Sequence, residues 1–553
     1  GALAASGVFA GAGSVSLNWI SNSIEAFIAS SDISSEDIVI EAFDRSTINA
    51  VSGQINIGGA AGIGAAAGYN EINNDVKAYV NGGSVLTAGN NIIVNACSES
   101  EINSIVAGGS FGSTLGVSGT VAINIIENEV AAYIESSEMK ADNNIYFLAE
   151  SLNELSSYGG SVAGGFIGLS AASVINLIEN ITSAYVVDSV IEARGTGTAL
   201  IIKNWDENGL AGTEEASGLF VIAHNREALT IYSGSAGGGA VAVSGQVSVN
   251  LISDLTKAYI EASQINSEEN QGSRVIVRAG QETGIQVFTG SMTAGGVAAG
   301  AAVDTSTISN ETRAFIVDCR NDGNGEGYYG LYAADGVEVA AYNRLVPLDD
   351  ESTTIFGVAL SGLASVSGVV SVLTTDNITE AYIDNSTISV QGPVIVFAGH
   401  YLEADILAGS LSGSLFVGAG GTVVVSTFEN SVFAHIDSSL VETDAAVEVV
   451  ARSRDRIRVI TGTGSAGLAA GVAGAVAVTL IETTTEAWLY EVDIESQSVL
   501  VRSDNDTAVD SSCGSLGVGL GAGVGAAIDY ISILNRTIAY ISAGSRVYTT
   551  GDV

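Results

Sequence analysis

Proline is nearly absent from this sequence, which contains only Pro347 and Pro393 among 553 residues. A chain so poor in proline cannot be a proline-rich disordered linker. Its apolar content of 47% excludes disorder more generally, because such a composition buries a sizeable core. We therefore expect an ordered protein.

Cysteine and basic residues are also scarce. Cys97, Cys319 and Cys513 lie far apart and are odd in number, so they indicate neither a disulfide framework nor a metal motif. Only 19 Lys and Arg residues stand against 61 Asp and Glu residues, which gives a formal net charge of −42. Such a surface repels phosphate backbones and anionic headgroups, so we expect no nucleic-acid partner. It attracts divalent cations or basic partners instead.

No stretch shows an apolar stripe with a 3.6-residue period, so we expect little helix. Instead, Val, Ile, Tyr and Phe alternate with polar or small residues, as in half-buried β-strands. A lipid-spanning barrel needs aromatic girdles at two fixed depths, and a chain with 6% aromatic residues and one ring column in each repeat does not fit it, so we expect no membrane span. Glycine is abundant, with 68 residues, and gathers in recurring Gly/Ala-rich runs such as 107–119 and 295–302. Small side chains allow two backbones to approach closely, which predicts a thin core at these runs.

One pattern returns through the whole chain and is clearest at residues 128–137, Asn-Glu-Val-Ala-Ala-Tyr-Ile-Glu-Ser-Ser. Its core is Ala, a ring and an aliphatic residue, and it recurs about every 53 residues. The ten ring positions are Phe27, Tyr79, Tyr133, Tyr185, Tyr259, Phe315, Tyr382, His435, Trp488 and Tyr540. A fixed period of this length is typical of stacked repeats. We predict an all-β, right-handed parallel β-helix (β-solenoid) of ten ~53-residue repeats, forming one continuous array over residues 1–553.

The number of coils in one repeat is open at this point. Identical columns favour one broad coil, because like residues stack best on immediate neighbours. The small residues of the Gly-rich runs favour two narrower coils, because a wide interior needs larger side chains to reach native packing density. We favour two coils, which would place Tyr133 and Tyr185 about 10 Å apart along the axis, whereas one coil places them about 5 Å apart.

Polar residues form columns relative to the ring. Five residues before it stand Asn22, Asn74, Asn128, Asn180, Asp254, Asn310, Asn377, Asn430, Thr483 and Asn535. Nine residues before it, the first five repeats carry Asn18, Asn70, Asn124, Asn176 and Asn250, and four residues after it Ser dominates, with Cys319 as an isostere. An amide that returns in every coil can hydrogen-bond to its copies, so we interpret these columns as structural ladders rather than ligand sites.

Two repeats carry insertions at the same corner, at about 203–218 and 320–334. In solenoids such insertions emerge as loops on one face, often the contact face. Carboxylates lie beside glycine turns here, so cation binding, including Ca²⁺, is a hypothesis for Asp206, Glu207, Asp322, Asn324 and Glu326. The second loop resembles the first half of a calcium loop, but Ala333 occupies the position of its final Glu, so an acidic turn is the favoured interpretation. Trp205, in the first insertion, is expected to be exposed.

The Gly-rich run, Asn-Ile-Ile-Glu-Asn, Ala-Tyr-Ile and a closing Ile-x-Val-x-Ala together resemble the repeat region of giant secreted bacterial β-helix proteins of the leukotoxin-like and filamentous-haemagglutinin-like type. The resemblance covers nearly all 553 residues. It implies a β-helix displayed outside the cell, although the two acidic insertions depart from the pattern. Such proteins serve as adhesins, toxins or fibres, so the motifs indicate the repeat class but no activity.

We predict no enzymatic activity. The three histidines, His224, His400 and His435, belong to different repeats, and catalysis needs a local constellation of side chains. The run Arg452, Arg454, Arg456 and Arg458 has the spacing of one strand face and is expected to pair with the acidic surface. The predicted function is that of an extracellular structural protein, a solenoid rod that forms or extends a surface fibre. The alternative is an adhesin or toxin passenger that binds a receptor or glycan on host or neighbouring cells.

The ends of the sequence bear on its partners. Neither end resembles the polar cap that a solitary solenoid needs, and the chain starts with Gly-Ala-Leu rather than Met. We therefore expect a segment of a longer secreted protein, which self-associates into a filament or continues into further repeats.

Overall fold

The computed structural model describes residues 1–267, 272–320, 330–348 and 353–551, and these residues contain β-strands but no α-helix. No helix long and apolar enough to cross a membrane is therefore found among them. All long strands pair in parallel, from one repeat to the next. The predicted all-β parallel solenoid is thus confirmed.

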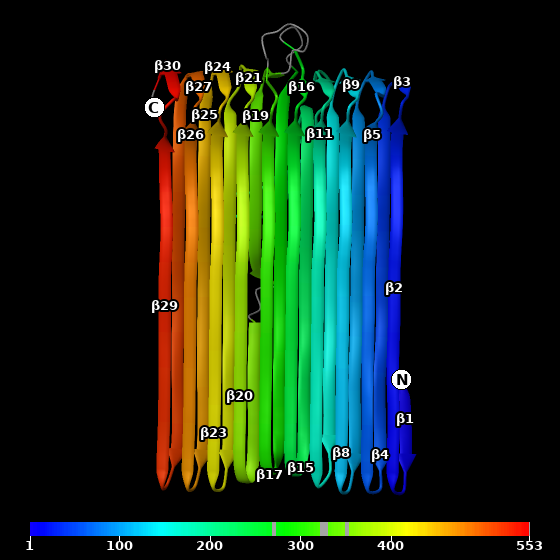
Figure 1. Ribbon diagram of the computed structural model, residues 1–553, viewed down its shortest axis with the longest axis vertical. Coiled ribbons are helices and arrows are strands. Elements are labelled where there is room, and N and C mark those ends of the chain that lie inside the picture. Colours follow the sequence, from blue (N-terminus) through cyan, green and yellow to red (C-terminus); the bar gives the residue numbers. More distant parts are fainter. Residues whose placement is uncertain (268–271, 321–329, 349–352, 552–553) are drawn as a thin grey trace.

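Each repeat forms one coil with two long sides and one short side. In the coil that contains residues 128–137, β7 (Ile92–Gly112) and β8 (Leu115–Glu135) have 21 residues each, and β9 (Glu138–Ala141) has four. At about 3.3 Å per residue a long side measures about 70 Å, whereas ten coils spaced by about 4.8 Å measure about 48 Å. The molecule is therefore a flat slab whose longest dimension runs along the strands (Figure 1).

The long strands form one continuous sheet of 18 strands that folds back on itself at the Gly-rich runs. We call its halves sheet 1 and sheet 2, and the fold between them the Gly-rich corner. Sheet 1 comprises β7 together with β1 (Ala2–Ser6), β4 (Ile38–Gly58), β10 (Ile145–Gly164), β19 (Gly336–Pro347), β22 (Val394–Ser414), β25 (Ala446–Gly467) and β28 (Ser498–Gly519). Sheet 2 comprises β8 together with β2 (Phe9–Ala29), β5 (Ala61–Asn81), β11 (Ile167–Val187), β23 (Val417–Asp437), β26 (Ala470–Tyr490) and β29 (Ala522–Ile541). The strands β15 (Gly218–Glu261), β17 (Arg274–Val317) and β20 (Thr353–Asp384) pass through the corner and belong to both sheets.

The third side of each coil is a short strand, and these strands form a ten-stranded sheet opposite the Gly-rich corner (Figure 1). This short sheet comprises β9 together with β3 (Asp32–Ser35), β6 (Val85–Ala88), β12 (Val190–Ala193), β16 (Gln264–Ile265), β18 (Leu331–Ala333), β21 (Thr387–Val390), β24 (Leu440–Thr443), β27 (Asp493–Ser496) and β30 (Arg546–Thr549). An antiparallel hairpin of β13 (Leu200–Trp205) and β14 (Ala211–Ala216) is the only departure from parallel pairing in the described ranges.

The prediction of two coils per repeat is wrong. Tyr133 and Tyr185 are direct register partners in adjacent strands, and their ring centroids lie 4.5 Å apart. The prediction assumed that a 53-residue coil encloses a wide interior. The two long sides instead lie face to face, close enough for Asn128 Nδ2 on sheet 2 to bond Asn153 Oδ1 on sheet 1 at 2.7 Å. Two packed sheets are only about 10 Å apart, so ordinary side chains fill the space.

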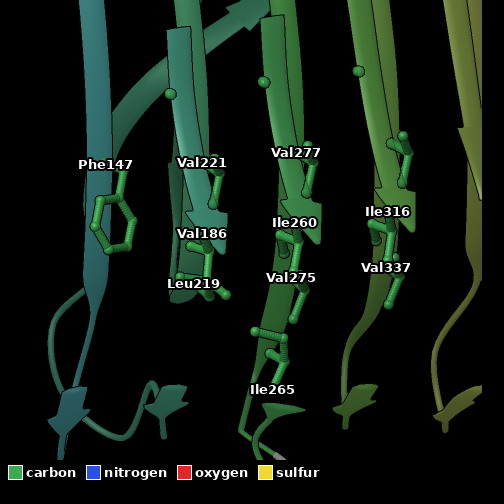
Figure 2. Close-up of a cluster of buried hydrophobic side chains, with 14 of the residues drawn as sticks. Phe147, Val186, Leu219, Val221, Ile260, Ile265, Val275, Val277, Ile316 and Val337 are labelled. Carbon is green, nitrogen blue, oxygen red and sulfur yellow. The ribbon is translucent and has the colours of Figure 1, made fainter. Parts of the chain in front are cut away.

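Alternation along the strands decides which side chains are buried. In β4, every second residue from Ile38 to Gly58 is buried and the residues between are mostly exposed. The largest apolar cluster lies where sheets 1 and 2 meet the short sheet, and Figure 2 shows Phe147, Val221, Ile260 and Ile316 within it. A second apolar cluster lies nearer the Gly-rich corner. Buried polar residues separate the two clusters.

Candidate functional site

The asparagines nine residues before the ring form a continuous amide ladder inside the slab. Nδ2 of each donates to Oδ1 of the next, at 2.8 Å for Asn18 to Asn70 and for Asn70 to Asn124. The bonds from Asn124 to Asn176 and from Asn176 to Asn250 are 2.9 Å. The register partner of Asn250 is Ser306, and the ladder ends there. These amides therefore connect successive coils directly.

The asparagines five residues before the ring behave differently. Most are buried and donate from Nδ2 across the interior to sheet 1, and Asn180 Nδ2 also donates to its copy Asp254 at 3.2 Å. Asn74 bonds Asp44 at 2.8 Å, and Asn310 bonds Thr283 at 3.0 Å. Across the column, the partners of Asn22, Asn74, Asn128, Asn180, Asn310 and Asn535 include residues of sheet 1, whereas Asn377 bonds Asn430 at 3.2 Å. Asn430 in turn lies 3.4 Å from Asp455 of sheet 1. This column thus ties the two long sheets together.

Several partners of these asparagines are buried carboxyl groups. Glu227 accepts a bond of 2.8 Å from Asn180, and Asp254 accepts one of 3.0 Å from Gln281. Burial raises the pKa of Asp254 and of Asp304 to about 7 and that of Asp455 to about 6, and burial and Asp254 raise the pKa of Glu227. Of these groups only Asp254 stands in a sequence column, so no repeated residue type marks the other three.

The serine column closes the corner between sheet 2 and the short sheet. Ser137 N donates to Ser189 Oγ at 3.2 Å, and Ser189 Oγ donates to the carbonyl of Val187 at 2.7 Å. The preceding residue, Asp188, turns the chain with a φ of 48°. Ser84 takes the same role, accepting a bond of 3.2 Å from Ser31 N, but sequence alignment on the ring missed it. Its corner contains Gly82 and Gly83 and is one residue longer.

The ring column forms a stack on the outer surface of sheet 2. Neighbouring ring centroids are 4.2 to 6.1 Å apart, and their planes are within 10° of parallel. His435 lies between Tyr382 and Trp488 in this stack, and its Nδ1 lies 2.8 Å from Asp437. Burial opposes the charged form of His435, but Asp437 and Glu380 outweigh it and raise its pKa. His435 therefore takes the structural place of the column ring.

The first insertion is the hairpin of β13 and β14, which lies on the outer face of sheet 1. Trp205 is only 4% exposed, so the expectation of an exposed tryptophan is wrong. Its ring stacks on Tyr342 at 5.7 Å and meets the edge of His224 at 5.4 Å. Below it, sheet 1 presents outward apolar residues where a solvated strand would be polar, among them Phe220 and Ile276. The hairpin is thus a packed layer rather than a free loop.

Ion pairs fasten this hairpin to the sheet. Lys203 Nζ and His224 Nδ1 approach Glu150 Oε1 at 2.6 and 2.9 Å. Burial alone would raise the pKa of Glu150, but these two groups lower it to about 2. Arg278, with a side chain only 2% exposed, pairs with Glu214 of the hairpin at 2.6 Å and Glu338 of the sheet at 2.5 Å. Every charge named here has a counter-charge, so the cluster acts as an anchor.

The hairpin tip contains two of the residues in the cation hypothesis. Asp206 Oδ1 accepts bonds from the amides of Asn208 and Leu210, at 2.8 and 2.9 Å. Glu207 reaches Arg452 on β25, at 2.5 Å. Asp322, Asn324 and Glu326 lie outside the described residues. In the part of the chain that the structure describes, no group of three His, Cys, Asp or Glu residues is placed to hold a metal ion.

The remaining candidates from the sequence are the arginine run on β25 and the histidines, and all of them lie in the described residues. The arginine run lies on one face of β25 and pairs with acidic residues, as predicted: Arg456 Nη2 lies 2.6 Å from Asp506, and Arg458 pairs with Asp405. His400 is buried 3.8 Å from Asp455, and burial lowers its pKa to about 3. The three histidines therefore lie in three separate environments, and the structure does not bring them together.

Replacing Trp205 by alanine is expected to detach the hairpin while leaving the solenoid folded. Deleting a buried tryptophan side chain typically costs about 3–5 kcal/mol, and here that loss falls on one hairpin. Trypsin should then cleave after Lys203 at least tenfold faster, with unchanged far-UV circular dichroism. Ile201→Ala is the matched control, because Ile201 lies on the same strand with 68% exposure. Equal cleavage rates for the two variants would show that Trp205 does not hold the hairpin.

The sites are thus an interior amide ladder, an asparagine column that joins the two long sheets, a serine column at the corner, an outer ring stack and an anchored hairpin. In comparisons with protein-family models, with curated proteins and with solved structures, no significant match to this chain was found. The fold itself is that of a repetitive parallel β-solenoid.

Proposed function

We propose that this protein is an extracellular structural rod, a solenoid that forms or extends a surface fibre by adding coils along its axis. The observation that carries the proposal is the parallel pairing of ten successive coils, in which the ring column continues from the first coil to the last. Each coil is a template for the next, because the same groups recur at the same positions. The net charge of −42 would keep such an assembly soluble.

Burial shows how much each coil gains from its neighbour. Ile481 and Leu489 of β26 are 2% and 0% exposed, whereas their partners in the last coil, Ile533 and Ile541, are 47% and 42% exposed. Covering one such side chain stabilises the assembly by about 1.5–3 kcal/mol when its burial is complete. A further coil, from the same chain or from a second copy, would gain this energy along the whole edge.

Electron microscopy and fibre diffraction of the purified protein test this proposal. The expected result is long filaments of uniform width, with a reflection at about 4.8 Å along the filament axis. Single rods whose length does not increase with protein concentration would contradict the proposal that the protein forms filaments. Such rods bound to cells through a receptor or glycan would favour the adhesin alternative.

A charge on the inner side of the last coil is expected to stop axial growth. Ile533→Lys places an ammonium group where the next coil would bury it, and an unpaired buried charge is strongly unfavourable. Leu534→Lys adds the same charge to the neighbouring residue, whose side chain points outward and is 64% exposed. We expect Ile533→Lys to shorten filaments at least tenfold and Leu534→Lys to leave their length unchanged. Equal lengths for both variants would exclude growth through this edge.

A further inference from the structure

The outer surface of sheet 1 divides into a charged half and an uncharged half. In the middle of the strands, outward residues include Glu99, Arg226 and Asp405. From there to the Gly-rich corner no outward residue of the described strands carries a charge. We call this region the apolar half, and its outward residues belong to 51–58, 105–112, 158–164, 232–238, 288–294, 354–360, 407–413, 460–466 and 512–518. Many are large and exposed, such as Val51 at 71% and Met292 at 53%.

A groove runs through the apolar half along the solenoid axis. Outward glycine and alanine form its floor, namely Gly53, Ala107, Gly160, Gly234 and Gly290 in successive coils. Leu3, Ile55, Val162 and Met292 line one side. The volume is about 920 Å³, and the ring of Phe356 closes one end by lying over Gly290.

A ridge runs beside the groove, two residues earlier on each strand. It comprises Val51, Ile105, Tyr158, Tyr232 and Phe288, which are register partners. The rings of Tyr158 and Tyr232 stack with centroids 5.5 Å apart, and Phe288 follows at 6.0 Å. Ridge and floor are about 7 Å apart along the strand, so a raised and a sunken apolar column lie side by side.

The area of this surface is large for an uncovered patch. Nine strands at about 4.8 Å and eight residues at about 3.3 Å give on the order of 1,100 Å². Monomeric proteins rarely expose apolar patches above about 300–600 Å², whereas each partner of a stable complex buries about 800 Å². The apolar half therefore has the size of a stable protein interface.

We propose that the apolar half pairs face to face with the same surface of a second copy, so that the side chains along one side of each groove enter the groove of the other copy. A two-fold axis that lies parallel to the solenoid axis, halfway between the floor column and the column of Ile55, Val162 and Met292, brings the two apolar halves face to face and places these side chains over the groove floor of the other copy. One surface is thus complementary to itself, as symmetric dimers require. The pairing is lateral and does not depend on axial growth of the rod. A lipid surface is disfavoured as the partner, because a strongly acidic chain is repelled by anionic headgroups. Lipid binding also does not require alternating raised and sunken columns on the protein surface.

Sedimentation velocity and small-angle scattering of the full chain test the pairing. We expect a concentration-dependent dimer that is twice as thick as one slab and no longer along its axis. The variant Val51→Glu/Val162→Glu places charges in the apolar half and should weaken this dimer at least a hundredfold. Thr47→Glu/Asn49→Glu adds the same charge to the charged half of β4 and should leave the dimer intact. Circular dichroism checks that both variants fold.

A further variant distinguishes specific pairing from nonspecific hydrophobic association. Gly160→Leu fills the groove floor without a clash, since a Cβ there lies 4.0 Å from its nearest neighbour, the carbonyl oxygen of Gly234. Because side chains of the other copy would fill this groove, the pairing predicts a dimer at least tenfold weaker, although the surface becomes more apolar. A tighter dimer or larger aggregates would overturn the proposal. A monomeric wild type, one that floats with phosphatidylcholine vesicles, or a dimer that is longer rather than thicker would overturn it as well.

Discussion

Replacing Gly116 by valine is expected to open the Gly-rich corner, whereas the same substitution at Gly119 is expected to be tolerated. A Cβ at Gly116 would lie 2.3 Å from the carbonyl oxygen of Gly164 and 2.7 Å from that of Ser110. Nothing lies within 4 Å of a Cβ at Gly119, which points outward from the same strand. Overpacking costs about 1–3 kcal/mol when side chains can yield. Here the Cβ would meet backbone atoms, which cannot move aside as side chains do. We therefore expect the free energy of unfolding to fall by about 3 kcal/mol or more.

The same close approach recurs through the solenoid, so the effect should not depend on one coil. A Cβ at Gly168, Gly418 or Gly471 would also come within 2.2 to 2.5 Å of a backbone oxygen. Denaturant unfolding followed by circular dichroism measures the loss, and limited proteolysis near residues 112–116 shows whether it begins at the corner. If the Gly116 and Gly119 variants unfold at the same denaturant concentration, the two sheets are not held in contact there.

The fold could be predicted from two periods in the sequence. Alternation of apolar and polar residues indicates strands with one buried face, and the 53-residue return of the ring indicates stacking. The number of coils was not predictable from the same features. Small residues such as Gly116 suggested a narrow coil, but they mark the edge where two long sheets converge. Residue size shows how close two backbones lie and does not show how many turns the chain has made.

The interior sites were only half visible in the sequence. The asparagine columns stand out because one residue type repeats, and the structure places them inside the slab. Their partners on sheet 1 differ in residue type, so no repeated residue marks them in the sequence. These partners are Asp44, Asn153, Glu227 and Thr283. The hairpin was recognised as an insertion, yet its packing was missed. A usable signal was present, because Phe220 and Ile276 are large apolar residues at outward positions.

The solenoid is expected to be more stable at pH 5 than at pH 8. Burial raises the pKa of Asp254 and Asp304 to about 7 and that of Asp455 to about 6, whereas an unfolded Asp has a pKa of about 3.9. Between these values only the folded state holds the proton. The stability from each group is complete below about pH 4 and is lost as pH rises through the folded pKa, by about 1.4 kcal/mol per pH unit.

Groups whose pKa is lowered, among them His400 and Glu150, act in the opposite direction but mainly at lower pH. Burial lowers the pKa of His400 to about 3, so the unfolded state gains a proton as pH falls below about 6.5. Glu150, with a pKa of about 2, loses stability only below about pH 4.5. Between pH 5 and pH 8 the three aspartates therefore outweigh the single histidine. The denaturation temperature should fall by several degrees over this range.

The variant Asp304→Asn separates this effect from the repulsion among surface charges. Asp304 is 1% exposed and takes part in hydrogen bonds with Asn250 and Ser306, and an asparagine keeps its shape without the charge. We expect it to stabilise the protein at pH 8 by on the order of 2–4 kcal/mol and to reduce the difference between pH 8 and pH 5. Glu179→Gln is the control, because it removes one negative charge from an exposed site on β11. Both are measured in about 0.5 M salt, where surface charges are screened. If Asp304→Asn and Glu179→Gln change the pH profile equally, the buried aspartate is not the group that titrates.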